Sequence, residues 1–155
     1  MTETIKIQEQ QIEQELFEKS LKEAEQVLDT EAQSVLNLKE SIDSDFKEIM
    51  KLILSSEGRI AFIGMGKSGL VAKKLAATFS SLGTPAFFVH AGEALHGDLG
   101  MITEDDVIIA VSNSGETEEI LNMLPSLRRI GAKMVAFTGD CSSTLGEYAD
   151  ICIFS

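Results

Sequence analysis

Three short segments of this sequence combine glycine with hydroxyl side chains, a composition suited to binding a phosphate group. They are residues 64–69 (GMGKSG), 112–117 (SNSGET) and 138–143 (TGDCSS). In the second segment Gly115 permits close approach of the backbone, and a helix beginning near Glu116 would point unpaired N–H groups at a ligand. Ser112, Ser114 and Thr117 add hydroxyl groups, so one phosphate can be bound without arginine. The alternative is an ordinary helix cap, because Ser, Asn and Thr are also preferred capping residues.

The first segment also matches the dinucleotide-binding pattern G-x-G-x-x-G. Such a site needs an acidic residue at the end of the second strand for the ribose hydroxyls, whereas that strand ends in residues 87–90 (FFVH). A P-loop is excluded because Ala61 stands where that motif requires glycine. A nucleotide-dependent oxidoreductase is therefore the weaker alternative. Lys67 is a single cation in a glycine-rich turn. The alternatives for it are a cation that stabilises a reacting anion and an ordinary solvated lysine.

Two histidines and two carboxylates follow the second expected strand, namely His90, Glu93, His96 and Asp98. Zinc binds such side chains, but spacings of three and six residues do not place His90, Glu93 and His96 on one helical face. We therefore expect no required cofactor, with a structural or inhibitory zinc at His90 and His96 as the lesser alternative. An imidazole that exchanges protons near neutral pH, or that serves as a structural hydrogen-bonding group, fits the pattern better.

Beyond Gly58 the sequence alternates short apolar runs with segments of helical period, which predicts an α/β fold. Strands are expected at 59–63, 85–89, 107–111, 133–137 and 151–154, without the polar alternation of a sheet that faces water. Helices are expected at 68–82 and 116–130, ended by Gly83 and Gly131, with shorter turns at 92–96 and 142–148. The first helix should face the sheet with Val71, Leu75, Phe79 and Leu82, and the second with Ile120, Leu124, Leu127 and Ile130. The prediction is a three-layer α/β/α domain with a five-stranded parallel sheet in the flavodoxin-like order 2-1-3-4-5. Its ligand belongs at the carboxyl ends of the strands, where the three segments gather.

Residues 1–56 precede this domain and predict a helical N-terminal arm. Apolar residues recur at helical spacing from about Ile12 to Ile42, and Asp45 with Glu48 would cap a second helix through Leu54. We expect the arm to pack on the domain of residues 57–155, to form a dimerisation helix, or to do both.

Composition narrows the possible partners. The 155 residues carry a formal net charge of -12, from 13 basic and 25 acidic side chains. Residues 1–50 hold 5 of the basic and 13 of the acidic side chains. An acidic chain is a poor partner for nucleic acid or an anionic membrane surface, although one phosphate held by local dipoles remains compatible. Cys141 and Cys152 lack metal-site spacing and fit a reducing compartment better than a disulfide scaffold. With neither a secretory start nor a membrane-spanning run in the sequence, we expect a soluble, unprocessed protein in the cytoplasm.

Three motifs in this order resemble one family. Residues 64–69, the segment 90–101 (HAGEALHGDLGM) and residues 112–116 closely resemble the SIS (sugar isomerase) domain of the arabinose-5-phosphate isomerase family. The middle motif is the most specific, and the resemblance runs from about Val35 to the end of the sequence. It implies interconversion of ribulose 5-phosphate and arabinose 5-phosphate for Kdo synthesis, in lipopolysaccharide or capsule formation. It also implies a homo-oligomer, a dimer or tetramer.

The resemblance assigns roles to individual residues. Lys67, His96 and Glu119 match positions regarded as catalytic, and Ser112, Ser114 and Thr117 fall on the phosphate-binding loop. We expect four further residues to contribute to substrate binding, namely Gly66, Ser68, Asn113 and Gly115. An aldose–ketose isomerase moves a proton between neighbouring carbons and stabilises an enediolate, which a carboxylate, a cation and an imidazole can do together. An ordinary first-turn carboxylate is the alternative for Glu119.

The sequence departs from the family after its fifth expected strand. Family members continue with a helix, a second acidic motif and a Ser-His-Pro-Gly-Gly segment, and many then carry paired CBS domains. The SIS domain is therefore expected to be C-terminally incomplete here, or to be completed by a partner subunit. A non-catalytic phosphosugar-binding or regulatory module is the alternative function.

Overall fold

The computed structural model describes the backbone of residues 2–154 and the side chains of residues 12–40 and 42–154. The chain divides between Glu40 and Ser41 into two units. The first unit consists of helix α1 (Thr2–Asn37), and the 3-10 helix η1 (Leu38–Ser41) follows it. Leu21, Leu28 and Val35 lie seven residues apart on α1, and their side chains are more than half exposed. No helix within residues 2–154 is long and apolar enough to cross a membrane.

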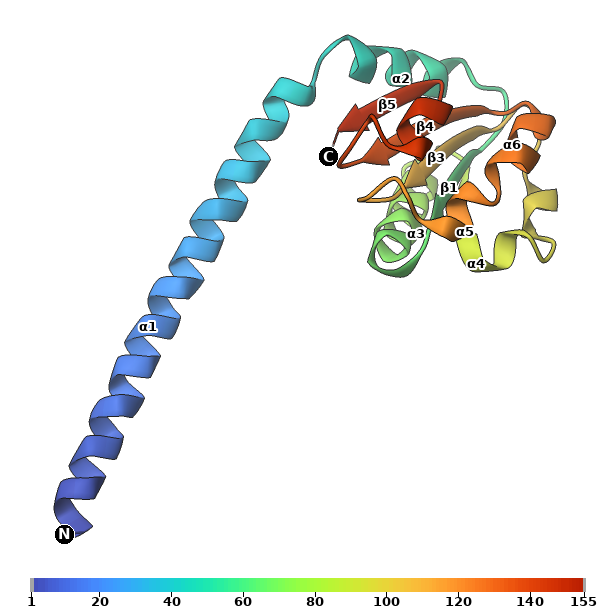
Figure 1. The fold of residues 1–155 in the computed structure, drawn as a ribbon. Coiled ribbons are helices and arrows are strands. Elements are labelled where there is room, and N and C mark those ends of the chain that lie inside the picture. Colours follow the sequence, from blue (N-terminus) through green and yellow to red (C-terminus); the bar gives the residue numbers. More distant parts are fainter. Residues whose placement is uncertain (1, 155) are drawn as a thin grey trace. The chain divides into compact units, whose positions relative to one another are not determined.

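The second unit is built on a five-stranded sheet (Figure 1). Its strands are β1 (Ile60–Gly64), β2 (Ala86–His90), β3 (Val107–Val111), β4 (Lys133–Thr138) and β5 (Ile151–Phe154). All pairings are parallel, in the order β2-β1-β3-β4-β5. The predicted α/β class, strand order and strand positions are confirmed, with shifts of one residue at some strand ends.

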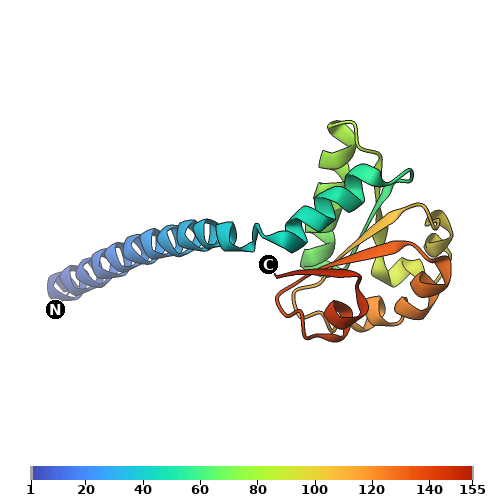
Figure 2. The same cartoon turned by 90° about the horizontal axis from the view of Figure 1, so that it is seen from above.

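Helices cover both faces of this sheet (Figure 2). One face carries α2 (Ser44–Ser55) and α3 (Gly66–Ser81). The other carries the short helices α4 (Ala91–Ala94), α5 (Glu118–Leu121), α6 (Leu124–Ile130) and α7 (Thr144–Tyr148). A 3-10 helix, η2 (Asp98–Met101), precedes β3. This is the predicted three-layer arrangement.

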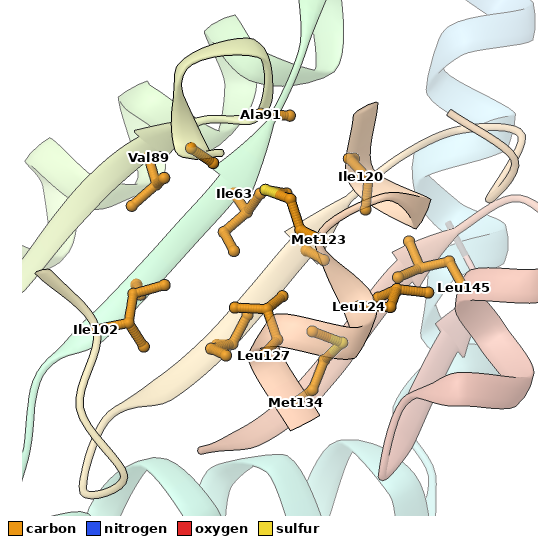
Figure 3. Close-up of a cluster of buried hydrophobic side chains, with 14 of the residues drawn as sticks. Ile63, Val89, Ala91, Ile102, Ile120, Met123, Leu124, Leu127, Met134 and Leu145 are labelled. Atoms are coloured by element: carbon orange, nitrogen blue, oxygen red, sulfur yellow. The ribbon is translucent and has the colours of Figure 1, made fainter. Parts of the chain in front are cut away.

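The alternation of side chains along each strand produces two apolar clusters, one on each face. Ile60 and Phe62 of β1 pack on the α2 and α3 side, whereas Ala61 and Ile63 pack on the other side. Figure 3 shows part of the second cluster, which contains the labelled side chains of α5, α6 and α7, Met123 between α5 and α6, and Ile63 and Met134 of the sheet. Because both faces are buried, the strands contain apolar residues at nearly every position.

The inward face of α3 differs from the prediction. Leu75 and Phe79 pack on the sheet as expected, but Val71 is 53% exposed and Leu82 is 80% exposed. Gly69, Ala72 and Ala76 are buried instead. A Cβ on Gly69 would lie 3.2 Å from the Gly64 carbonyl carbon, so the helix approaches β1 closely and only small residues fit between them.

The single helix expected at 116–130 is two helices, α5 and α6. Ile120, Leu124 and Leu127 are buried as predicted, and Ile130 is partly buried. The break lies at residues 122–123, and Pro125 follows in the first turn of α6, where its missing N–H costs nothing. Gly131 ends α6 with a φ of 86°, as the sequence predicts.

Helix α2 belongs to the second unit. Ile49 is buried, and Leu52 and Ile53 pack against the apolar cluster on that face of the sheet. The N-cap is Asp43, whose carboxylate accepts hydrogen bonds from the Asp45 and Phe46 amides at 2.9 and 3.2 Å, so the cap predicted at Asp45 is wrong. How the arm lies against the domain stays a prediction.

The expectation for the cysteines is also wrong. Cys141 and Cys152 form a disulfide, with 5.9 Å between their Cα atoms. The two cysteines meet because α7 turns the chain back, so that β5 runs beside β4 and brings Cys152 toward the loop that holds Cys141. Cysteine count and spacing carry no information on that path.

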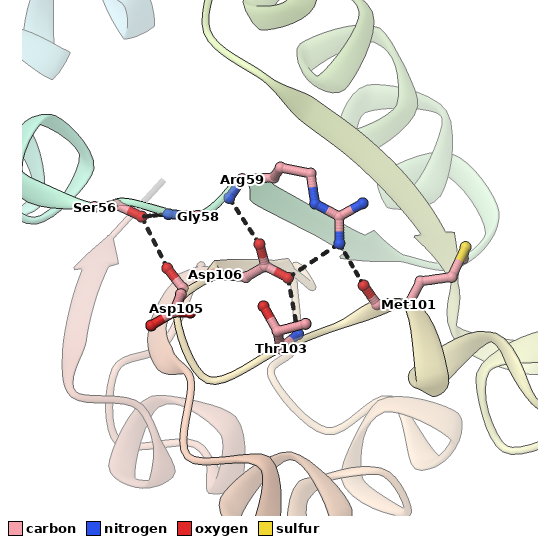
Figure 4. Close-up of polar contacts among 7 residues, drawn as sticks. All are labelled: Ser56, Gly58, Arg59, Met101, Thr103, Asp105 and Asp106. Atoms are coloured by element: carbon pink, nitrogen blue, oxygen red, sulfur yellow. Dashed lines mark hydrogen bonds and ion pairs between the residues drawn. The ribbon is translucent and has the colours of Figure 1, made fainter.

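At the amino-terminal edge of the sheet, the carboxylate of Asp106 joins the segment before β1 to the turn before β3 (Figure 4). Asp106, which is 2% exposed, accepts hydrogen bonds from the amides of Arg59 at 2.7 Å and Thr103 at 2.8 Å. The Arg59 guanidinium lies 3.4 Å from the same carboxylate, donates to the Met101 carbonyl and stacks 4.4 Å above the Phe87 ring. Burial alone would raise the pKa of Asp106, but the hydrogen bonds from Thr103 and Arg59 outweigh it and hold the pKa below its usual value.

Candidate functional site

The segment 112–117 follows β3 and forms a loop braced by its own hydroxyl groups. Ser112 is buried, and its Oγ lies 2.8 Å from the Thr117 Oγ1 and accepts a hydrogen bond from the Gly115 amide at 3.2 Å. Ser114 is exposed, and its Oγ accepts from the Glu116 amide at 3.2 Å. These contacts hold the loop in one conformation before any ligand arrives.

Several amides of this loop remain open. In the part of the chain that the structure describes, the N–H groups of Asn113, Ser114 and Thr117 have no hydrogen-bond acceptor. The α5 helix begins directly after Thr117, so its first amides add to the same set of donors. Thr117 makes no side-chain cap, and open donors of this kind are suited to an anion. The choice between a phosphate cradle and a helix cap stays a prediction.

The third segment, 138–143, lies against this loop. Gly139 donates to the Asn113 carbonyl at 2.9 Å, and the Thr138 hydroxyl lies 3.4 Å from the same oxygen. Gly115 has a φ of +66°, and a Cβ there would overlap the Ser143 Oγ. Glycine at 115 is therefore required by backbone conformation and by this close approach. The two loops pack as one body at the carboxyl ends of β3 and β4.

The first segment supplies a second set of open amides. Gly66 has a φ of +57°, and Met65, the N-cap of α3, provides no side-chain acceptor. Within the described residues the N–H groups of Gly66, Lys67 and Ser68 have no hydrogen-bond partner. The glycines of G-x-G-x-x-G therefore serve the tight turn and the close packing of α3 on β1.

The three residues expected to be catalytic come from three different elements. Lys67 lies in the first turn of α3 and is exposed, Glu119 lies in α5 and is partly buried, and His96 lies in the segment between α4 and η2 and is exposed. Parallel strands end at one edge of the sheet, so the topology places Lys67, His96 and the 112–117 loop at that edge. Contacts between α4 and α5 bring the segment that follows β2 beside the helix of Glu119. The roles of these residues stay predictions.

His90 has a structural partner. Its Nδ1 accepts the Gly92 amide at 3.2 Å, so His90 caps the short helix α4. Within the described residues no group of three His, Cys, Asp or Glu side chains is arranged to hold a metal ion. The imidazole of His90 thus fits the role of a structural acceptor.

Sequence reasoning missed two residues that shape the site. The sequence indicates Glu116 only as a first-turn carboxylate, yet its Oε1 accepts the Thr144 amide at 2.6 Å. Ser143 fills the space behind Gly115 and caps α7. A Ser just before a helical segment is a readable cap signal, but a contact across 28 residues has no local signal.

A hollow of about 400 Å³ lies away from these loops, between α6, α7 and the amino end of β4. Arg128, Lys133, Glu147 and Asp150 are among the residues that line it. Two of its cations have partners inside the chain, since Lys133 contacts Asp150 at 2.7 Å and Arg128 stacks on Tyr148. The open amides, rather than this hollow, mark the candidate site.

The fold and the loops define a class of protein: a doubly wound α/β domain with a loop of open amides after its third strand. Residues 53–155 match the model of the SIS domain family, and the chain belongs to that family. The predicted resemblance is therefore confirmed at the level of the family.

Named relatives narrow the similarity. The chain is 47% identical over 128 residues to the arabinose 5-phosphate isomerase KdsD of Pseudomonas aeruginosa, covering 83% of this chain and 39% of the relative. It is 46% identical over 126 residues to the arabinose 5-phosphate isomerase KpsF of Escherichia coli, covering 81% of this chain and 40% of that protein. The chain thus spans about two fifths of the length of these curated relatives.

Solved structures show the same fold. A protein of Escherichia coli CFT073 in complex with arabinose 5-phosphate has a TM-score of 0.72 and 50% identity, covering 77% of this chain and 65% of that one. A putative phosphosugar isomerase of Bacteroides fragilis, involved in capsule formation, has a TM-score of 0.81 and 34% identity, covering 86% of this chain and 72% of that one.

Proposed function

We propose that this chain is the SIS portion of an arabinose 5-phosphate isomerase, which interconverts ribulose 5-phosphate and arabinose 5-phosphate and supplies Kdo synthesis. The observation that carries the proposal is the braced 112–117 loop with its open amides, found in a chain 47% identical to an enzyme of that name. The loop would bind the phosphate through the N–H groups of Asn113, Ser114 and Thr117 and through the Ser114 hydroxyl.

The sugar then extends toward the first turn of α3. Glu119 moves the proton between the two carbons, Lys67 stabilises the developing oxyanion, and His96 exchanges a proton with a hydroxyl group. Gly66 and Ser68 contribute amides beside Lys67. This reaction transfers protons only, so we infer that it requires no cofactor, and excess EDTA should leave turnover unchanged.

We propose a homo-oligomer, a dimer or tetramer, because the apolar side chains of α1 at Leu21, Leu28 and Val35 follow a seven-residue spacing and are exposed. We also place the protein in the cytoplasm. The substrate class supports this location, since a charged phosphate ester does not cross hydrocarbon readily, whereas the disulfide between Cys141 and Cys152 gives it no support. Light scattering and cell fractionation test these two statements.

The second candidate is a phosphosugar-binding module without turnover. It is favoured by one observation: the loop amides are held in place without a ligand, whereas Lys67 and His96 are exposed and their side chains make no hydrogen bond to another described residue. Both candidates require the same phosphate loop.

A coupled assay and a calorimetric titration of the same preparation separate the candidates. Turnover of ribulose 5-phosphate supports the isomerase, and binding of arabinose 5-phosphate without turnover supports the module. Ser114→Ala should weaken binding by about 1–2 kcal/mol, because it removes one hydroxyl donor to the phosphate and the hydrogen bond that holds the Glu116 amide in place. A wild-type chain that binds neither pentose phosphate would refute both candidates.

A further inference from the structure

The amino end of α7 is an anchor point for the phosphate loop. An α-helix leaves its first N–H groups without partners inside the helix, and α7 begins at Thr144. The Thr144 amide donates to the Glu116 Oε1 at 2.6 Å, and the Leu145 amide donates to the Gly115 carbonyl at 3.1 Å. The Gly146 amide donates to the Ser143 Oγ at 3.3 Å. Two of these three acceptors belong to the 112–117 loop.

These hydrogen bonds explain why the amino end of α7 is not itself a binding site. Its first amides already donate to acceptors within the chain, whereas the amides of Asn113, Ser114 and Thr117 have no acceptor among the described residues. The contact is charge-assisted, because a carboxylate meets a helix amino end with its partial positive charge. It joins residues 28 positions apart and spans from the loop after β3 to the helix after β4.

The Glu116 contact adds a second link between the loop and α7. Ser112 is buried and its amide donates to the Phe137 carbonyl, and the Gly115 carbonyl accepts the Leu145 amide at 3.1 Å. Between Gly115 and α5 the contacts are local: the Ser114 Oγ accepts the Glu116 amide, the Thr117 hydroxyl contacts Ser112, and the Thr117 carbonyl accepts amides of α5. At Glu116 and Thr117 themselves, the Glu116 side chain makes the one hydrogen bond to an element distant in the sequence that the described residues show.

We propose that Glu116 is a positioning residue: its carboxylate fastens the 112–117 loop to α7 and keeps the loop amides directed at a bound phosphate. Glu116 does not touch the phosphate itself, since a carboxylate beside a phosphate would repel it. The proposal rests on the proposed function for the identity of the ligand, but the tether between Glu116 and Thr144 can be tested without any ligand.

Three variants test the tether. Glu116→Ala removes the acceptor, Glu116→Gln keeps an acceptor oxygen without charge, and Glu147→Ala removes another exposed carboxylate, from α7 itself. Arabinose 5-phosphate and inorganic phosphate serve as probes in calorimetric titrations. We expect Glu116→Ala to weaken binding of both probes about tenfold, Glu116→Gln to remain within about threefold of the wild type, and Glu147→Ala to match it.

Amide hydrogen exchange on the ligand-free chain supplies the second readout, and thermal unfolding verifies that each variant is folded. Glu116→Ala should speed exchange at Thr144 and at the hydrogen-bonded amides of Gly115 and Glu116, and Glu116→Gln should restore most of the protection. Unchanged exchange in Glu116→Ala would overturn the proposal, as would equal loss of affinity in Ala and Gln variants with normal exchange. If the wild type binds neither probe, the proposed function fails, and the exchange data alone decide whether Glu116 orders the loop.

Discussion

The two edges of the same sheet are built in opposite ways. At the amino-terminal edge, Asp106 and Asp150 stand directly before β3 and β5. Asp106 accepts the amide of Arg59, directly before β1, Asp150 accepts the amide of Met134 in β4, and each carboxylate faces a cation. At the carboxyl-terminal edge, glycines and hydroxyl side chains hold loops whose amides stay open. Ion-paired carboxylates thus accept the amides at one edge of the sheet, whereas at the other edge described loop N–H groups have no acceptor and can bind a ligand. A net charge of -12 is therefore compatible with an anionic ligand at the open edge.

Removing the carboxylate of Asp106 breaks the closed edge. In Asp106→Ala the amides of Arg59 and Thr103 and the Arg59 guanidinium lose their shared acceptor, so we expect a loss of about 3 kcal/mol in the free energy of unfolding. Urea denaturation measures it, with Asp105→Ala, an exposed neighbour, as the control. Affinity for arabinose 5-phosphate at low temperature should not change, and a binding defect in the folded variant would contradict the separation of the two edges.

Removing the disulfide should lower the stability of the domain at β4, β5 and the loop between them. Cys141 and Cys152 are 11 residues apart, so the crosslink restricts the unfolded chain by about 2–3 kcal/mol. Cys141→Ser should lower stability by that amount, and a reducing agent should do the same to the wild type. Adding the reductant to Cys141→Ser is the control and should have no effect. Equal stability of wild type and variant without reductant would show that the disulfide does not form.

Crowding the open edge tests the loop itself. Gly115→Ala places a Cβ against the Ser143 Oγ at a φ of +66°, so the loop must move, and we expect affinity for arabinose 5-phosphate to fall about thirtyfold, about 2 kcal/mol. Gly83→Ala is the matched control, because Gly83 also has a positive φ, of +94°, but no atom lies within 4 Å of its added Cβ. It should bind normally and lose about 1 kcal/mol of stability from backbone strain. Normal affinity in Gly115→Ala would contradict the proposed phosphate loop.

The pH dependence of stability gives a smaller signal from the closed edge. The pKa of Asp106 is lowered in the folded state, so its ionised form contributes stability that is present above about pH 4, and that is lost as pH falls through the folded-state pKa. Denaturation between about pH 6 and pH 3 should show a steeper fall for the wild type than for Asp106→Asn. Parallel curves would mean that Asp106 does not stabilise the fold through its charge.

The strands and the loops between them were predictable because their signals are local. Short apolar runs placed β1 to β5 within about one residue, and the three polar segments do lie at strand ends. The inward face of α3 was not predictable from period alone, because the close approach of Gly64 and Gly69 turns Ala72 and Ala76 to the sheet. The large apolar side chains of Val71 and Leu82 predicted the buried face of α3. The close approach of the α3 and β1 backbones, which only small residues permit, determines that face instead.

Contacts between residues far apart in the chain could not be predicted from local sequence patterns. The disulfide depends on the return of the chain through α7, and the acceptor for the Thr144 amide is Glu116 from a different crossover. Neither residue pair has a spacing that distinguishes it from chance. The site that local patterns predicted is thus a set of donors, and the contacts that hold those donors in place were visible only in three dimensions.

The most direct test of the proposed phosphate loop is an NMR titration of the 15N-labelled chain with arabinose 5-phosphate, followed at each backbone amide. We expect saturable shifts at Asn113, Ser114 and Thr117, accompanied by smaller shifts at residues 66–68, and no change around Asp106. Shifts confined to the cations Arg128 and Lys133 at the other end of β4, with the 112–117 loop unaffected, would contradict the proposal.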